Sequence, residues 1–244
     1  MALGFYSTYG TGSGDYVLVP GDLGVDGAWT FAFSLYFNTI GEVGGRVINW
    51  EDGTSNGITL YTQHTYQLTL DIWPWSGNRY GCGFGVTNNT WLRVAVSYDP
   101  GDTANDPLMY VNGSEISESQ GKTPSGTYHG PTGNLYIGNS SGANRTLDGI
   151  IADFGMWSEA KDAETLKAMS NGASGLMYPR NRVFYIDGIR TAKDSHGASL
   201  TTSGIVANDH PRIYYPSMSP QIGGAAAPAA SNTGPRNLLT LGCG

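Results

Sequence analysis

The sequence predicts an all-β chain that folds as a two-sheet antiparallel jelly-roll sandwich, with one short helix and a C-terminal extension. Short runs that alternate apolar and polar residues recur along the chain, at a spacing of about 8–12 residues that is typical of sandwiches. Asn-Gly and Asp-Gly turn pairs separate these runs, and no helical pattern alternates with them, which argues against a parallel α/β sheet. The 36 glycines and 15 tyrosines among 244 residues also fit a chain of strands and tight turns.

The clearest strand is the stretch WTFAFSLYF at residues 29–37. Because side chains alternate between the two faces of a strand, its large apolar residues share one face, which carries Trp29, Phe31, Phe33, Leu35 and Phe37. The opposite face carries Thr30, Ala32, Ser34 and Tyr36. We therefore expect a half-buried strand whose apolar face forms the centre of the core.

Further strands are expected at short intervals, over residues 45–50, 57–62, 66–73, 91–98, 107–113, 134–138, 149–157 and 182–189. One helix is expected over residues 163–170, because Asp162 is a suitable N-cap and an Asn-Gly pair follows as a stop signal. Leu166 and Met169 would share its apolar face.

These patterns divide the chain into four segments. They are an N-terminal arm (1–15), the sandwich with its helix (16–190), a turn-rich C-terminal extension (191–222) and a tail rich in Ala, Pro and Gly (223–244). The tail has almost no charge and the composition of a low-complexity segment. We expect it either to be disordered or to lie against a partner.

Charge and composition exclude several classes of partner. The net charge is −7 and the 13 Lys and Arg residues are scattered, whereas nucleic acid and anionic membrane surfaces require clustered cations. No stretch approaches the ~18 apolar residues of a membrane span, and no signal peptide is visible, so we expect synthesis and maturation in a cytoplasm. Cys82 and Cys243 have no disulfide-framework or metal spacing and are expected to be unrelated free thiols.

Three motifs, taken in order, resemble the laminin G-like, concanavalin A-like family. WTFAFSLYF is similar to an early inner-sheet strand of that family. WLRVAVSYD followed by LMYVNGSEI is similar to its Trp-led strand and hairpin, and the segment from NLYIG to the end of the predicted helix is similar to its closing segment. The resemblance runs from about residue 16 to residue 172 and implies a jelly roll that binds glycans or proteins through rim loops.

A second resemblance covers residues 187–215. DSHGASLTTSGIVANDHP is similar to segments attached to laminin G-like domains in many phage and bacterial surface proteins. The pattern departs from those segments at residues 194–197, which carry an insertion, and at Arg212, which follows Pro211. This resemblance implies a component of a phage virion or a bacterial surface.

No constellation of catalytic residues stands out. The related glucanases place carboxylates alternately along one strand, as E-x-D-x-E, so that an acid and a nucleophile flank one bond, and the sequence has no such run. Glu51 and Asp52 are adjacent and Asp148 and Asp153 are five apart, so each pair would face opposite sides of a strand. No nucleophile elbow is present either. We therefore predict a protein that is not an enzyme, with a glycoside hydrolase or lyase as the remote alternative.

The loop DPGDTAND, between two predicted strands, is a candidate calcium site. Asp99, Asp102 and Asp106 carry the oxygen ligands that Ca²⁺ prefers, and the resembled family binds Ca²⁺ at loop rims in positions that vary among its members. The spacing is not that of an EF-hand, and Asp and Asn also favour turns for local reasons. A solvated acidic connector is therefore the alternative, and no other cofactor is expected.

The segment WPWSGNRYG is the candidate glycan site. Trp73, Trp75 and Tyr80 could stack on a sugar ring, and Asn78 and Arg79 could hydrogen-bond its hydroxyls. The alternative is that these aromatic residues pack in the core or in a protein interface.

The leading hypothesis is a structural or decoration protein of an assembled particle, namely a phage virion, made in the host cytoplasm and displayed on the virion surface. It would form homo-oligomers or bind neighbouring subunits through its termini, and it could bind glycans through its loops. The alternative hypothesis is a carbohydrate-binding or adhesin module of a cell surface, with or without dependence on Ca²⁺.

Overall fold

The fold comes from a computed structural model of the chain. The structure describes residues 2–5, 14–39, 44–51, 57–63, 67–73, 77, 80–117, 119–186 and 200–208.

The described residues form strands almost throughout, with one α-helix and one 3₁₀ helix. In chain order the elements are β1 (Ala2–Phe5), β2 (Tyr16–Val19), β3 (Trp29–Phe37), β4 (Arg46–Glu51), β5 (Gly57–Gln63), β6 (Gln67–Ile72), β7 (Tyr80–Gly85), β8 (Trp91–Tyr98), β9 (Leu108–Val111), β10 (Ser114–Glu115), β11 (Ser119–Lys122), β12 (Leu135–Ile137), β13 (Gly149–Trp157), α1 (Ala163–Ser170), η1 (Gly175–Met177), β14 (Arg182–Ile186), β15 (Thr201–Ser203) and β16 (Val206–Asn208).

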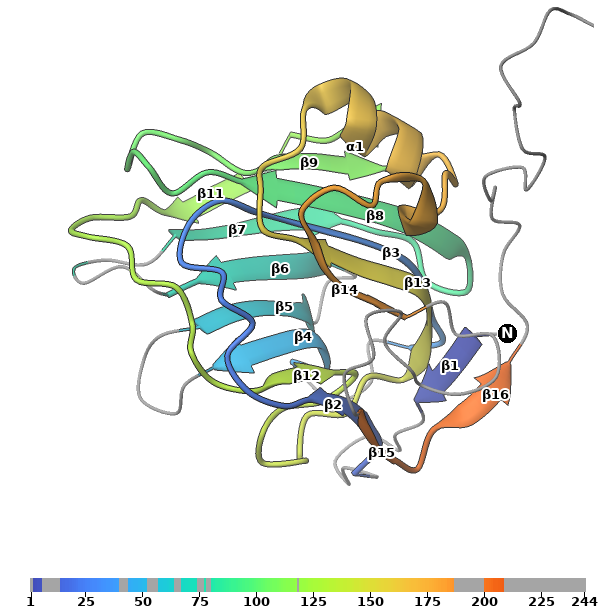
Figure 1. Ribbon diagram of the computed structural model, residues 1–244. Helices are drawn as coiled ribbons and strands as arrows, with labels where there is room; N and C mark the ends of the chain where they lie inside the picture. Colours follow the sequence, from blue (N-terminus) through green and yellow to red (C-terminus); the bar gives the residue numbers. More distant parts are fainter. Residues whose placement is uncertain are drawn as a thin grey trace, which may run out of the picture.

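Two antiparallel sheets form the body of the molecule, which confirms the predicted sandwich (Figure 1). Sheet A has the strand order β10-β9-β8-β3-β13-β1-β16, and β14 also pairs with β13. Sheet B has the strand order β11-β7-β6-β5-β4-β12-β2-β15. Strands that are distant in sequence are neighbours in both sheets, as in β3-β13 and β4-β12, so the loops from different parts of the chain gather at the sandwich ends.

The core lies between the two sheets, and the inner face of β3 is its centre, as predicted. Trp29, Phe31, Phe33 and Leu35 are at most 4% exposed. The Phe33 ring stacks on that of Phe154 from the neighbouring β13, with ring centroids 5.7 Å apart. Burying side chains of this size stabilises the fold by about 1.5–3 kcal/mol each.

The opposite face of β3 differs from the prediction of a half-buried strand. Thr30, Ala32 and Ser34 are at most 6% exposed. Part of the cause is α1, which packs on β3, β8 and β9 (Figure 1) and covers Ala32. The connection before α1 covers Thr30, whose hydroxyl bonds to Glu159 and Lys161. A second, smaller core under the helix consists of Ala32, Ala95, Tyr110, Trp157, Leu166 and Met169.

The helix begins and ends where the sequence predicts. The Asp162 side chain accepts a hydrogen bond of 2.8 Å from the Thr165 backbone N–H, which satisfies one of the amides that a helix start leaves without a partner. Gly172 has φ +101°, the left-handed conformation that commonly ends a helix. Within the described part of the chain, no helix is long and apolar enough to cross a membrane.

Three short strands come from segments predicted to lie outside the sandwich. β1, from the predicted N-terminal arm, lies between β13 and β16 in sheet A. β15 and β16, from the predicted extension, pair with β2 and β1. Both segments therefore add strands to the sheets, and the boundaries at residues 16 and 190 do not separate them from the sandwich. The predicted tail (223–244) lies outside the described residues.

Candidate functional site

Three loops meet at one end of the sandwich and enclose an open hollow of about 570 Å³, which we call the loop-end hollow. The loops follow β2, β8 and β11 in the chain. The hollow is lined by Asp26, Gly27, Asp99, Pro100, Gly101, Asp102, Thr103, Gly126, Thr127 and Tyr128. Its size falls in the range of ~300–1,000 Å³ that is typical of small-ligand sites.

Strand pairing and close backbone packing hold the three loops together. Trp29 at the start of β3 pairs with Tyr98 at the end of β8, and their rings lie 5.8 Å apart beside the hollow. Gly130 brings the third loop against the first, because a Cβ at this position would lie 2.3 Å from the backbone oxygen of Val25. Only glycine permits that approach, which keeps the two loops close together beside the residues of each that line the hollow.

Two carboxylates on the rim are held by their own turns. Asp99 accepts a hydrogen bond of 2.9 Å from the backbone N–H of Gly101, and Asp102 accepts one of 2.9 Å from Ala104. In both cases Oδ1 makes the bond, which leaves Oδ2 without a hydrogen-bond partner among the described residues. Each turn therefore orients a carboxylate while keeping one oxygen as an acceptor for a ligand.

The aromatic side of the hollow is Tyr128, which is half-buried. Burial raises the pKa of Tyr128, and the nearby Trp29 side chain offsets only part of that rise. The phenol is therefore uncharged across the physiological range. Its ring gives the hollow an apolar surface beside the hydroxyl groups of Thr103 and Thr127.

The charge of the hollow has one sign. Asp26, Asp99 and Asp102 line it, and no Lys, Arg or His is among the described lining residues. Carboxylates close together raise the local negative potential, most strongly at low salt. The hollow therefore disfavours anions and suits groups that donate hydrogen bonds.

The predicted calcium ligands are only partly brought together. Asp99 and Asp102 line the hollow, but Asp106 does not, and Gln120 donates to Asp106 at 3.5 Å. Across the described residues, no group of three His, Cys, Asp or Glu side chains could hold a metal ion. The DPGDTAND loop therefore forms one wall of the hollow and brings together two of its three predicted ligands, and calcium binding there stays a prediction.

The predicted glycan segment leads to the same end of the molecule. Trp73 is half-buried just after β6, and its backbone N–H donates to Gly57 at 2.7 Å. The Gly77 N–H donates to the Ser125 carbonyl at 3.0 Å, one residue before the part of the chain that lines the hollow. Trp75, Asn78 and Arg79 lie outside the described residues, and only the backbone of Tyr80, the first residue of β7, lies within them.

Asp26, Thr127 and Tyr128 line the hollow but lie outside the predicted site. Asp26 precedes a glycine just before β3, a pattern that signals only a turn. Tyr128 belongs to a long connection without a strand pattern, between β11 and β12. Their common position results from loop packing, for which a single sequence gives no signal.

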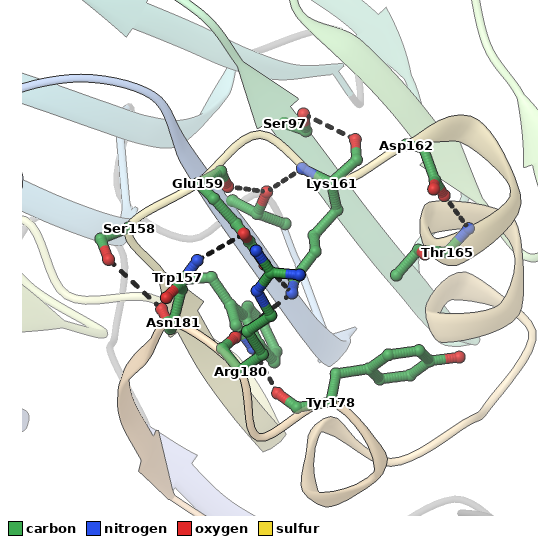
Figure 2. Close-up of polar contacts among 11 residues, drawn as sticks. Ser97, Trp157, Ser158, Glu159, Lys161, Asp162, Thr165, Tyr178, Arg180 and Asn181 are labelled. Carbon is green, nitrogen blue, oxygen red and sulfur yellow. Dashed lines mark hydrogen bonds and ion pairs between the residues drawn. The ribbon is translucent and has the colours of Figure 1, made fainter.

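A second polar cluster lies between β13 and α1, and Figure 2 shows its side chains. We call it the α1 clasp; it consists of residues 158–162 with Thr30, Ser97 and residues 178–181. Lys161 forms an ion pair with Glu159 and donates to the Arg180 carbonyl at 3.3 Å. The hydrogen bond from Lys161 lowers the pKa of Glu159, and Asn181 also donates to this carboxylate.

The backbone of the clasp also forms hydrogen bonds, with two hydroxyl groups of sheet A. The Thr30 hydroxyl donates to the Glu159 carbonyl at 2.7 Å and accepts from the Lys161 N–H at 3.0 Å. The Ser97 hydroxyl donates to the Lys161 carbonyl at 3.1 Å. The clasp therefore fixes the start of α1 on sheet A, and its polar groups are engaged with one another.

A third carboxylate site lies on sheet B. Glu51 accepts hydrogen bonds from Asn49 at 2.7 Å and from Thr59 at 3.2 Å, and Tyr61 donates to Asp71 at 3.3 Å. Asp71 is 5% exposed. These carboxylates belong to different strands, so they are not the single-strand arrangement of the glucanases.

Asp153 occupies a bulge in β13, where the pairing with β3 shifts between Ala152 and Gly155. Its φ of +52° places it in the left-handed region, which shifts the alternation of side chains along the strand. Tyr185 and Ser174 donate to its carboxylate. Burial raises the pKa of Asp153 to about 6, although these hydrogen bonds oppose the shift.

A sequence family model for the concanavalin A-like lectin/glucanases superfamily matches residues 11–167, well over half of the chain. The chain belongs to this superfamily. No protein of curated function matches the sequence.

Solved structures of the superfamily type share the fold at low sequence identity. A proposed carbohydrate-binding protein from Bacteroides ovatus matches with a TM-score of 0.58 and 20% identity, over 84% of this chain and 58% of that chain. A heptameric SAP-like pentraxin from Limulus polyphemus matches with a TM-score of 0.54 and 15% identity, over 84% of this chain and 93% of that chain. At these identities the likeness establishes the jelly-roll fold alone.

Proposed function

We propose that the protein is a non-enzymatic carbohydrate-binding module and that the loop-end hollow is its glycan site. The observation that carries this proposal is the pair Asp99 and Asp102, each held by a turn through one oxygen while the other oxygen remains an acceptor. Sugar hydroxyls are hydrogen-bond donors, and a carboxylate accepts about twice as strongly as a neutral group.

The chemistry of the hollow favours an uncharged saccharide. Three carboxylates without a cation would repel uronic acids, sulfated sugars and phosphates. Thr103 and Thr127 can both donate and accept, and the Tyr128 ring can lie against the C–H face of a sugar. An apolar wall with a few oriented polar groups is the common composition of a small-ligand site.

Membership of a superfamily named for lectins and glucanases supports the proposal. The structural likeness to the proposed carbohydrate-binding protein of Bacteroides ovatus adds support at the level of fold. The absence of the single-strand E-x-D-x-E arrangement from the sequence favours binding over hydrolysis.

The test is a glycan array followed by calorimetric titration of the best neutral ligand. Asp102→Asn keeps the Oδ1 acceptor that holds the turn and replaces Oδ2, the oxygen offered to the ligand, with an uncharged NH2 group that donates hydrogen bonds. We expect it to weaken binding at least about tenfold, because hydrogen bonds to charged groups contribute about 1.5–3 kcal/mol.

The matched control is Asp22→Asn. Asp22 is exposed, and it accepts a hydrogen bond of 2.8 Å from Gly24 in the same kind of turn, but it does not line the hollow. The Asp22→Asn variant should bind the glycan with the same affinity as the wild type. Equal losses in the two variants, or no ligand for the wild type on the array, would refute the proposal. A parallel titration in EDTA separates a calcium-dependent site from one that binds sugar directly.

The second candidate function is that of a subunit or decoration protein of an assembled particle, such as a phage virion. The observation that favours it is that three short strands complete the sheets: β1 lies between β13 and β16, and β15 and β16 lie at the sheet edges. A chain that completes its sheets with such short segments can also receive one from a neighbouring subunit. Light scattering of the purified chain tests this role, and a strictly monomeric protein at every concentration would count against it.

A further inference from the structure

One edge of β13 is shared by two partners in succession. β14 pairs with its second half, from Phe154 opposite Ile186 to Trp157 opposite Arg182. β1 pairs with its first half, from Gly149 to Ile151. The bulge at Asp153 lies between the two halves. The position of β1 is therefore a slot along β13 that ends where β14 begins.

β16 forms the other wall of this slot. It pairs with β1 through Ala2, Leu3 and Gly4, and β1 is its only strand partner among the described residues. β1 thus lies between two strands, with three register pairs on each side. If β1 leaves, the edge of β13 is opened and β16 loses its ladder, so an extended segment is needed to complete sheet A.

The next described strand after β1 lies in the other sheet. β2 pairs with β12 and β15 in sheet B, so residues 6–15 connect the two sheets. A connection of this length can extend to at most about 35 Å, which is comparable to the width of a small domain. The ladders of β1 are backbone contacts, which residues 2–5 of any copy would make equally well.

We infer that the slot between β13 and β16 accepts residues 2–5 of a second copy of this chain, so that two copies associate by exchanging β1. The exchanged ladders are the same as those formed within one chain, and reciprocal exchange closes a two-fold dimer. The balance between the two forms is therefore set by protein concentration. This inference is independent of the proposed glycan site, which lies in other loops.

The test uses two variants with one introduced cysteine each, neither of which can form the relevant disulfide alone. Gly4 is paired with Ile150 in the ladder of β1 and β13. One batch carries Gly4→Cys and the other Ile150→Cys; they are mixed at high concentration, or unfolded and refolded together, and then oxidised. Peptide mass spectrometry identifies the linked residues, so the native Cys82 and Cys243 can remain. A single chain that carries both Gly4→Cys and Ile150→Cys serves as a check that residues 4 and 150 lie opposite each other in the ladder.

We expect a disulfide between residues 4 and 150 of different chains, at a yield several-fold above that of a control mixture. The control pairs Gly4→Cys with Ser125→Cys, because Ser125 is exposed and lies away from β13. Three results would overturn the inference. These are a link only within the double variant, no link at all, and an equal yield with Ser125→Cys.

Leu3→Pro gives an independent measurement, because proline removes a backbone N–H from the middle of β1. Size-exclusion chromatography with light scattering should show a wild-type dimer that grows with concentration and a Leu3→Pro protein that stays monomeric. An unchanged dimer in this variant would contradict strand exchange.

Discussion

The α1 clasp and the loop-end hollow are both built from polar side chains on connections between strands, but they use those side chains differently. In the clasp, Lys161, Glu159 and Thr30 bond to one another or to nearby backbone, and the Lys161 side chain is only 10% exposed. In the hollow, Asp99 and Asp102 are exposed, and each uses one carboxylate oxygen to accept a hydrogen bond from the backbone of its own turn.

The difference separates a structural cluster from a binding surface. A polar group that is buried and fully bonded holds the fold, because removing its partner leaves an unsatisfied group away from water. A polar group that is oriented by a turn but still has an acceptor is available to a ligand. Substitutions in the clasp should therefore change stability and leave binding intact, and substitutions in the hollow should do the reverse.

The largest effect is expected at Thr30. Thr30→Val removes the hydroxyl that serves both the Glu159 carbonyl and the Lys161 N–H, and Thr30 is fully buried. Two buried groups losing a partner should lower the free energy of unfolding by about 2–5 kcal/mol. Urea unfolding measures this change. The matched variant is Thr103→Val, which lines the hollow and should unfold like the wild type. Equal losses of stability in the two variants would contradict the difference between the clasp and the hollow.

A smaller effect, with a pH signature, is expected at Asp153. Burial raises the folded-state pKa of this carboxyl to about 6, above its ordinary value of 3.8. Its contribution to stability is therefore fully present below about pH 4 and is lost as the pH rises through 6, by up to about 3 kcal/mol. The groups that face it are Tyr185 on β14, Ser174 and the Gly175 N–H, and Arg93 on β8.

Unfolding of the wild type and of Asp153→Asn across pH 4–7 measures this contribution. The difference in unfolding free energy between the two proteins should change over that range and level off at both ends. A constant difference would show that the carboxyl titrates normally in the folded protein.

The ion pair of the clasp should have a more modest effect. A double-mutant cycle with Lys161→Met and Glu159→Gln should give a coupling energy of about 1 kcal/mol, because the Glu159 side chain is still 27% exposed and solvent screens the pair. Unfolding at low and high salt should show the coupling fall. A coupling near zero would mean that the backbone bonds alone hold the clasp.

The smallest effect on stability is expected in the hollow itself. Asp99→Asn preserves the turn bond to Gly101 and should change the free energy of unfolding by less than about 0.5 kcal/mol. The same variant should lose affinity for the glycan that the wild type binds. A large loss of stability would place Asp99 among the structural carboxylates instead.

Periodicity in the sequence was sufficient to place the central strands and the helix. WTFAFSLYF alternates over its full length and spans β3, and the N-cap and the Asn-Gly pair mark both ends of α1. The short strands β1, β15 and β16 have no such pattern, because three or four residues cannot display a period. The Asp153 bulge likewise escapes a strand pattern, since alternation alone does not reveal an extra residue.

The candidate site was only half predictable for a similar reason. Asp99 and Asp102 stand out because an acidic turn between two strong strands is visible in the sequence. Asp26 and Tyr128 come to the same hollow from two distant loops, which touch at Gly130, and that contact is a property of the packed fold.

The most direct test of the central claim is to map a bound saccharide by NMR. A titration of labelled protein with the best neutral glycan should shift the backbone amide signals of residues 26–27, 99, 101–103 and 126–128, which line the hollow. Signals of the α1 clasp should stay in place. Shifts centred on Glu51 and Asp71 of sheet B, with the hollow unperturbed, would contradict the account.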